Sequence, residues 1–215
     1  MDRRVQRTRQ ALHTAMLHSL AAQPWDEIHV LGLCERANVG RSTFYGHFPS
    51  REALLRDCLA AMGARFLALG QARAHAASLP LRFVEPMLTH LLEQRSTFHT
   101  LLARTANAYV HQQMQAMVND LVAHELARQG LPPSWRTESL AHALGGATFG
   151  VLVGAIGSRE PPTAPAAAAL LNAMAAAMIA SAVVLAGANE CGDPKAGSTG
   201  PDLPVRAGPG LGVLG

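Results

Sequence analysis

The sequence of 215 residues contains few groups that cross-link a chain or bind a metal ion. Its three cysteines are odd in number, widely spaced and form no Cys-x-x-Cys pair, which excludes a disulfide framework and indicates a reducing, cytoplasmic setting. Two of them, Cys34 and Cys58, fall on apolar helical stripes, where we expect buried thiols. The ten histidines include no His-Glu-x-x-His motif and no pair four residues apart. We therefore predict no metal site and no cofactor.

Sequence motifs of common catalytic folds are also missing. The chain has no Gly-x-Ser-x-Gly, no phosphate-binding glycine loop and no Gly-x-Gly-x-x-Gly. The acids Asp26, Glu27 and Asp57 have no convincing nucleophile or base beside them in the sequence. We predict from these absences that the protein is not an enzyme. Residues 1–10 are polar and charged, so we expect no signal peptide.

Charged residues are absent from two long apolar segments, residues 139–157 and 161–189. About twenty apolar residues can span a bilayer, and Gly146, Gly150 and Gly154 form a small-residue row of the kind that packs membrane helices closely. One interpretation is a small membrane-associated helical protein with a hairpin at 139–187. The second segment is mostly alanine, however, and neither has an aromatic belt. We favour a homodimer without a membrane partner, in which both helices pack across a twofold axis.

Helical signals dominate the rest of the sequence. Alanine and leucine are abundant, apolar residues recur at helical spacing, and no alternating strand pattern occurs. We predict an all-α fold of about nine helices, at residues 3–22, 30–37, 41–47, 51–75, 81–93, 95–105, 107–129, 136–157 and 165–187. Residues 1–50 would form a small three-helix domain, and residues 51–187 a larger helical domain that includes the dimer contacts. Residues 188–215 are rich in glycine and proline and predict a disordered tail.

Two short helices joined by a tight turn indicate the function of the first domain. Apolar residues from Val30 to Ala37 form one helical face, and Asn38-Val39-Gly40 then breaks the pattern. Asparagine and glycine tolerate the left-handed backbone conformation that a tight turn needs. The segment therefore predicts a helix-turn-helix, in which the second helix enters the major groove of DNA and the first crosses the backbone.

The second helix has an inner and an outer face. Phe44 and Phe48 are four residues apart and point into the small core. The opposite face is small and carries hydroxyl groups that reach base edges or phosphates. Gly46 is costly inside a helix, which is explained if another surface approaches closely there. His47 lies beside the core face, where it either packs or contacts DNA. The candidate DNA-binding residues are Arg41, Ser42, Thr43, Tyr45, Gly46, His47 and Arg51.

Positive charge is concentrated near the start of the chain. The formal net charge is only +3, but Arg3, Arg4, Arg7 and Arg9 face a single neighbouring acid, Asp2. This balance fits double-stranded DNA as the partner. The first arginines form either a solubilising arm or an arm that contacts phosphates or the minor groove.

The most specific string consists of Trp25-Asp26-Glu27-Ile28 and the stretch Cys34-Glu35-Arg36-Ala37-Asn38-Val39-Gly40-Arg41-Ser42-Thr43-Phe44-Tyr45-Gly46-His47-Phe48-Pro49-Ser50-Arg51-Glu52-Ala53-Leu54. It resembles the TetR family of transcriptional regulators. In that family a helix ends in Ala-Gly-Val-Ser, and a recognition helix Thr-[Leu/Phe]-Tyr-x-His-Phe follows. The resemblance covers about residues 5–60. It implies a homodimer, a palindromic operator, repression, and release by an unknown small-molecule effector bound in the C-terminal domain.

Carried over by position, the resemblance implies DNA contacts from Thr43, Tyr45 and His47 and a phosphate contact from Arg51. Three positions depart from the family pattern. Asn38 replaces the glycine of the turn, and Gly40 replaces the following serine, so the second helix loses a side chain that caps it. His29 replaces the threonine that often opens the first helix.

An effector site is expected among apolar residues of segments 81–129 and 139–157, although each candidate is equally consistent with an ordinary core position. Methionine-rich linings suit varied apolar ligands. The candidate ligand-binding residues are Met87, His90, Phe98, Leu102, Tyr109, Met114, Met117 and Phe149. The predicted helix 51–75 joins the DNA-reading unit to this region, so we expect it to transmit the effect of the ligand.

Overall fold

The computed structural model describes residues 3–73, 78–103 and 107–190, and within these ranges it contains helices and no strand. The predicted all-α fold of about nine helices is therefore confirmed. The helices are α1 (Arg3–Ala22), the short 3₁₀ helix η1 (Trp25–Glu27), α2 (Val30–Ala37), α3 (Arg41–His47), α4 (Arg51–Ala72), α5 (Val84–Glu93), α6 (Arg95–Ala103), α7 (Ala108–Arg128), α8 (Trp135–Gly157) and α9 (Ala164–Glu190).

Some helix ends differ from the prediction. Helix α4 ends at Ala72 rather than at residue 75, and α9 continues to Glu190 rather than ending at residue 187. Helix α9 therefore includes the first three residues of the predicted tail, and the rest of that prediction, residues 191–215, lies outside the described residues. The turn η1 was not predicted; it follows Pro24, which has no N–H with which to continue α1.

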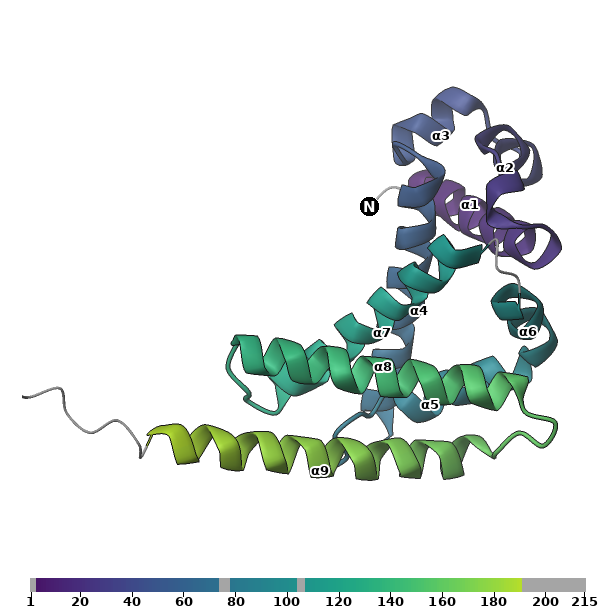
Figure 1. The fold of residues 1–215 in the computed structure, drawn as a ribbon. Helices are drawn as coiled ribbons and strands as arrows, with labels where there is room; N and C mark the ends of the chain where they lie inside the picture. The colour runs from purple at the N-terminus through teal and green to yellow at the C-terminus, as the bar shows by residue number, and fades with distance from the viewer. Residues whose placement is uncertain (1–2, 74–77, 104–106, 191–215) are drawn as a thin grey trace, which may run out of the picture.

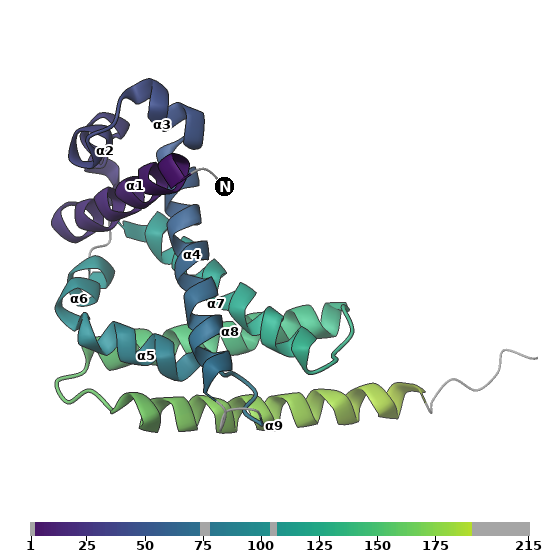
Figure 2. The same ribbon diagram turned by 180° about the vertical axis from the view of Figure 1, so that it is seen from behind.

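The helices form a small unit attached to a larger one. Figure 1 shows α1, α2 and α3 together at one end of the molecule and the long helix α9 at the opposite end. Helix α4 runs from the small unit towards α9. In the reverse view of Figure 2, α6 lies between the small unit and α5, and it packs on both α1 and α5.

The small unit has its own apolar core, which extends into the larger unit. Phe44 of α3 and Leu54 and Leu55 of α4 have no exposed surface. The same cluster includes Leu101 of α6 and Val110 of α7. The first turns of α4, directly after the predicted domain boundary at residue 50, therefore pack with both parts of the molecule.

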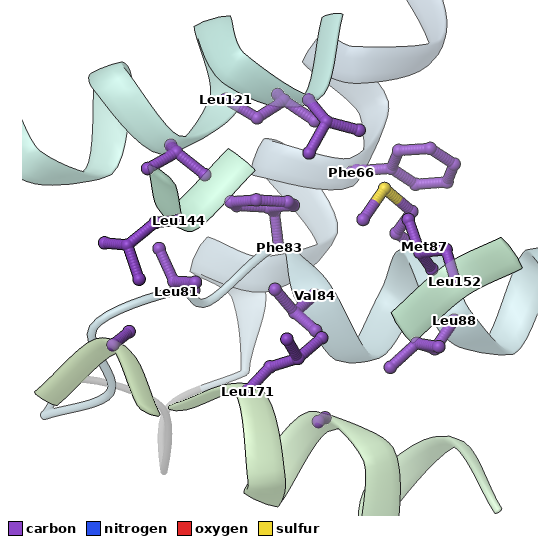
Figure 3. Close-up of a cluster of buried hydrophobic side chains, with 14 of the residues drawn as sticks. Phe66, Leu81, Phe83, Val84, Met87, Leu88, Leu121, Leu144, Leu152 and Leu171 are labelled. Carbon is purple, nitrogen blue, oxygen red and sulfur yellow. The ribbon is translucent and has the colours of Figure 1, made fainter. Parts of the chain in front are cut away.

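The second core lies among α4, α5, α7, α8 and α9. Figure 3 shows Phe83 and Val84 at its centre, with Leu171 of α9 packing from the side of the last helix. Gly70 of α4 permits the close approach of the chain before α5, because an added Cβ would lie 2.6 Å from the carbonyl oxygen of Arg82. Its neighbour Leu69 is 43% exposed, because Gly70 occupies the inner position of the helix.

A buried ion-pair cluster fixes the chain before α5. Glu125 of α7 is fully buried, and its carboxylate lies 2.6 Å from Nε of Arg128 and 3.3 Å from Nε of Arg82. Nearby, the N–H of Leu81 donates to Oδ1 of Asn172 at 2.8 Å. These contacts attach the same segment to α7 and α9, and they satisfy polar groups that would be costly to bury alone.

Candidate nucleic-acid interface

The turn between α2 and α3 forms as the sequence predicts. Asn38 adopts the left-handed conformation with φ 53° and ψ 49°, and its N–H donates to the carbonyl groups of Cys34 and Glu35. Asparagine tolerates this conformation better than most residues other than glycine. Gly40 then precedes α3 with extended backbone, and no side chain caps the helix. Asn38 thus supplies the geometry of the missing glycine, and the missing serine leaves α3 without a side-chain cap.

Helix α3 is held by its aromatic residues. Phe44 is fully buried and Phe48 is 4% exposed, which confirms that both belong to the core. The ring of Tyr45 meets Phe44 edge-on at 5.4 Å between centroids, yet Tyr45 is 51% exposed. The packing of Phe44 therefore sets which face of α3 points outward.

The outward face of α3 carries most of the candidate DNA-binding residues. Arg41, Ser42, Thr43 and Gly46 are exposed, and a Cβ added to Gly46 would meet no other atom within 4 Å. Nothing in the described part of the chain therefore requires a glycine at this position. His47 is half-buried, with its ring 6.3 Å from that of Phe48.

Arg51 differs from the other candidates because its guanidinium group is already engaged within the chain. It donates to the carbonyl oxygens of Trp25 and Ile28, pairs with Glu52 at 3.0 Å and lies 4.6 Å from the centroid of the Trp25 ring. This geometry joins the start of α4 to the turn before α2. It argues against the phosphate contact predicted for Arg51 and favours a structural role.

A second joint, not predicted from the sequence, links the small unit to α7. The backbone N–H of Trp25 donates to Oδ1 of Asn107 at 3.0 Å, and Nδ2 of Asn107 donates to the carbonyl group of Leu101 at 2.7 Å. The rings of Trp25 and Tyr109 stack with centroids 5.1 Å apart. Arg56 of α4 donates to the Tyr109 hydroxyl at 3.2 Å. No local pattern could reveal these pairs, because their partners are far apart in the sequence.

Polar contacts also attach α1 to α4. Asp57 accepts from Arg9 at 2.5 Å and lies 2.6 Å from Nε2 of His13. The guanidinium group of Arg9 also lies 5.1 Å from the centroid of the Phe48 ring. The first turns of α4 are therefore attached to α1 as well as to the end of α3, so that α4 and the small unit are held together at several points.

Positive charge is concentrated on the small unit. Residues 3–51 contain seven arginines and three acids, Asp26, Glu27 and Glu35, whereas the whole chain has a net charge of only +3. The rest of the chain therefore has no excess positive charge. A surface that is selectively positive attracts a polyanion such as DNA.

The candidate ligand-binding residues divide into three groups. Met87, Leu102, Met114, Met117 and Phe149 line one closed cavity of about 10 Å³, which has room for one water molecule at most. His90 lies beside this cavity, with its ring near those of Phe66 and Phe98 at 5.7 Å and 5.9 Å. Burial, together with the nearby charge of Arg65, lowers the pKa of His90. Tyr109 lies elsewhere, in the joint with Trp25.

A larger opening was not predicted. A half-open groove of about 480 Å³ lies between α4 and α7. Of the predicted ligand-binding residues only Met117 lines it, since the prediction did not consider α4 as a wall of the site. Within the described ranges, no group of three or more histidine, cysteine or acidic side chains could hold a metal ion.

Comparison with known proteins agrees with this geometry. Residues 14–58, from the middle of α1 into α4, match the family described as bacterial regulatory proteins, tetR family. This part of the chain therefore resembles the DNA-binding region of the TetR family. A 60-residue stretch, 27% of this chain, is 42% identical to the uncharacterized HTH-type transcriptional regulator YxbF of Bacillus subtilis (strain 168). That stretch corresponds to only 16% of the length of YxbF.

Solved structures of TetR-family regulators share the overall fold. One from Streptococcus agalactiae 2603V is 23% identical with a TM-score of 0.57, and the match covers 81% of this chain and 96% of that one. One from Syntrophomonas wolfei has a TM-score of 0.55 at 13% identity, covering 83% and 96%. Thermus thermophilus FadR, in complex with lauroyl-CoA, has a TM-score of 0.51 at 15% identity, covering 78% and 92%. The likeness therefore includes both the small unit and the helices behind it.

The last two helices of the chain, α8 and α9, present an apolar outer surface. Helix α8 and residues 164–184 of α9 are long and apolar enough to cross a membrane by length and composition. Leu170, Val183 and Val184 are each more than half exposed. On α8, Gly146, Gly150 and Gly154 are exposed, and an added Cβ would meet no atom of the described residues within 4 Å. The packing of one chain therefore does not explain these glycines.

Proposed function

We propose that this protein is a homodimeric transcriptional repressor that binds a palindromic operator through α3 and leaves it when a small molecule binds. The observation that supports this most directly is the orientation of α3. Phe44 is fully buried, so Thr43 and Tyr45 face outward on the most positively charged part of the chain. A regulator of this kind acts in the cytoplasm and needs no catalytic residue.

The outward residues have separate roles in the proposed complex. The hydroxyl groups of Ser42, Thr43 and Tyr45 contact base edges or phosphates, and the methyl group of Thr43 packs on a thymine methyl. Arg41 and His47 contact the backbone, which contributes salt-dependent affinity. Gly46 allows the DNA surface to approach α3 without obstruction, and Arg51 positions α4 and the turn before α2.

Replacing Gly46 with alanine tests this proposal, because the variant should be more stable than wild type and should bind the operator more weakly. In the free protein the new methyl group meets nothing within 4 Å, and alanine is favoured over glycine inside a helix by about 1 kcal/mol. We therefore expect the variant to be more stable to urea. If DNA approaches α3 closely, the same methyl group should weaken operator binding. Unchanged affinity for a selected operator would contradict the assignment of this face.

Thr43→Ala and Tyr45→Phe test the hydroxyl contacts. Both side chains are exposed, so stability should change little. A base contact is worth about 1–3 kcal/mol of discrimination, so a variant that loses one should lose preference for the selected sequence over random DNA. A variant that loses only a phosphate contact should bind both the selected sequence and random DNA more weakly, without a change in preference. A wild-type protein that shows no sequence preference at moderate ionic strength would refute the proposal.

The proposed dimer uses the outer surfaces of α8 and α9. Close packing across a twofold axis explains why Gly146, Gly150 and Gly154 face outward without a partner in the chain. Gly150→Arg should therefore give a folded monomer in analytical ultracentrifugation and reduce operator affinity. Ala68→Arg, at an exposed position on α4, is the matched control. Recovery of the wild-type protein only in detergent would favour a membrane hairpin instead.

The proposed release by a ligand relies on the methionine-rich interior. Met62, Met87, Met114 and Met117 surround the closed cavity, and flexible methionine side chains can rearrange around apolar molecules. The related fold of Thermus thermophilus FadR was solved with lauroyl-CoA. A ligand that binds better to the DNA-free conformation shifts the population away from the operator. Thermal-shift screening followed by gel-shift titration tests this step.

A further inference from the structure

The groove between α4 and α7 has the features of a ligand site in addition to its volume of about 480 Å³. Its walls are mostly small or apolar, and four polar residues lie among them. Ligand sites commonly combine an apolar surface of this size with a few polar groups. The apolar lining residues are Leu59, Ala60, Gly63, Ala64, Leu67, Ala116, Met117 and Leu121, and the polar ones are Arg56, Gln113, Asp120 and His124.

The contacts between α4 and α7 give the groove a direction. Arg56 bonds to Tyr109 near the start of α7. Further along both helices, a Cβ on Gly63 would lie 3.4 Å from Met117 and 3.3 Å from Leu121. The two helices therefore run in the same sense along the groove. Arg56 lies at the end near the small unit, while Asp120 and His124 lie towards the far end.

Arg56 supplies a positive charge that has no carboxylate partner within the described part of the chain. Its only bond there is to the neutral hydroxyl group of Tyr109, at 3.2 Å. Arg9, Arg51, Arg73, Arg82 and Arg128, by contrast, each pair with an acid. A planar guanidinium group next to an apolar surface is suited to bind a carboxylate whose remaining atoms are apolar.

The base of the groove can also adapt. Met117 lines both the groove and the closed cavity of about 10 Å³. Its side chain therefore separates the two spaces, and methionine rearranges easily. Gly63 brings α4 close to Met117 and Leu121, so that an apolar group in the groove would contact both helices.

We propose that this groove binds an amphipathic carboxylate, with the acid group at Arg56 and the apolar part over Gly63 towards Leu67. The carboxylate would compete with Tyr109 for Arg56, and the apolar part would press between α4 and α7. Because α4 follows α3 directly and Asp57 binds α1, displacement of α4 would move the DNA-reading face. This consequence for DNA rests on the proposed function, whereas the binding itself does not.

Decanoate, decanol and decyltrimethylammonium are suitable probes because they share one tail and differ in head group. The structure provides an optical signal, since Trp25 stacks on the Tyr109 that bonds to Arg56. The other tryptophan, Trp135, is 72% exposed and is removed by Trp135→Phe. In that full-length background we expect saturable decanoate binding that changes Trp25 fluorescence. Decanol should bind about tenfold more weakly, because it lacks the charged contact, and the cationic probe no better than decanol.

Two surface variants locate the site. Arg56→Gln should reduce decanoate affinity to that of decanol and leave decanol binding unchanged. Ala60→Phe fills the groove and should weaken decanoate and decanol alike by at least about tenfold. Ala61→Phe is the matched control, because Ala61 is exposed on α4 but does not line the groove, and it should bind as wild type. Urea denaturation verifies that each variant is folded.

Failure of this inference is distinguishable from failure of the proposed function. Absence of saturable decanoate binding, or binding that survives Arg56→Gln and Ala60→Phe, would overturn the groove site whatever the protein does with DNA. If decanoate binds as expected, it should release a selected operator from wild type but not from Arg56→Gln. A protein that binds decanoate in the groove but prefers no DNA sequence would overturn only the proposed function.

Discussion

Asn107 allows the joint between the small unit and the larger one to be tested quantitatively. Its side chain is fully buried and makes two hydrogen bonds, accepting from the Trp25 N–H and donating to the Leu101 carbonyl group. Asn107→Ala removes both and leaves one donor and one acceptor without their partners. Each buried polar group left in this state costs about 1–3 kcal/mol.

The expected loss for Asn107→Ala is about 3 kcal/mol, allowing for partial relaxation and water entry. In a chain of this length each kcal/mol corresponds to a shift in Tm of about 2–4 °C. Thermal denaturation followed by circular dichroism should therefore show a Tm lower by about 6–12 °C. Gln112→Ala, at an exposed position of α7, is the control and should shift the Tm by no more than about 1–2 °C.

Asn107→Asp separates the two bonds. The new carboxylate still accepts from the Trp25 N–H, but it repels the Leu101 carbonyl oxygen. Burial and this repulsion raise the pKa of the new carboxyl above its unfolded value. Below the unfolded pKa, the protonated group can donate to the carbonyl as the amide does. The free energy of unfolding of Asn107→Asp should therefore lie close to that of wild type at low pH and fall further below it as the pH rises through the folded pKa. If both variants melt with the wild type at every pH, the two hydrogen bonds do not stabilise the joint.

Three further changes test other parts of the structure. Arg51→Gln should lower the free energy of unfolding and leave the salt dependence of DNA binding unchanged, because the guanidinium group binds Trp25 and Ile28. If stability is unchanged and DNA affinity instead depends less steeply on salt concentration, Arg51 contacts a phosphate. Glu125→Gln removes the carboxylate shared by the half-buried Arg82 and the exposed Arg128 and should cost about 1–3 kcal/mol in urea denaturation, whereas Glu93→Gln at an exposed position should be neutral. Burial raises the pKa of Cys58 from 9.0 to about 12. The contribution of this thiol to the free energy of unfolding should therefore be fully present below pH 9.0 and be lost between pH 9.0 and about 12. Cys58→Ala should make the decline of stability over that range less steep.

Local sequence patterns predicted the parts of the structure that local interactions determine. The end of α2 and both ends of α3 agree with prediction, because Asn38, Gly40 and Pro49 lie at or next to these boundaries. The outer face of α3 could be predicted because Phe44 and Phe48 are the only large apolar residues in that short helix that lie four apart. Two independent signals, helical periodicity and turn chemistry, agree there.

Long-range contacts explain what the sequence patterns missed. Arg51 was assigned a phosphate contact, because nothing near it in the sequence shows that carbonyl groups 26 and 23 residues away accept hydrogen bonds from it. Tyr109 was assigned to a ligand pocket from its position within segment 81–129, but Trp25, far away in the chain, stacks on its ring. The groove was missed because it requires the relative placement of α4 and α7, which the periodicity of either helix does not contain.

The attachments along α4 differ from one half of the helix to the other, and this difference favours α4 as the moving element. Its first turns are fixed to the small unit through Leu54 and Leu55 in the core and through the contact of Asp57 with Arg9. From Arg56 onward, one side of the helix borders the groove, and its principal polar contact with α7 is a single bond to Tyr109. Along the groove, polar contacts therefore offer little resistance to a force between α4 and α7, and the resistance comes from apolar packing at Gly63 and Phe66. Because the first half of α4 is tightly attached to the small unit, any tilt of the helix has to carry α3 with it.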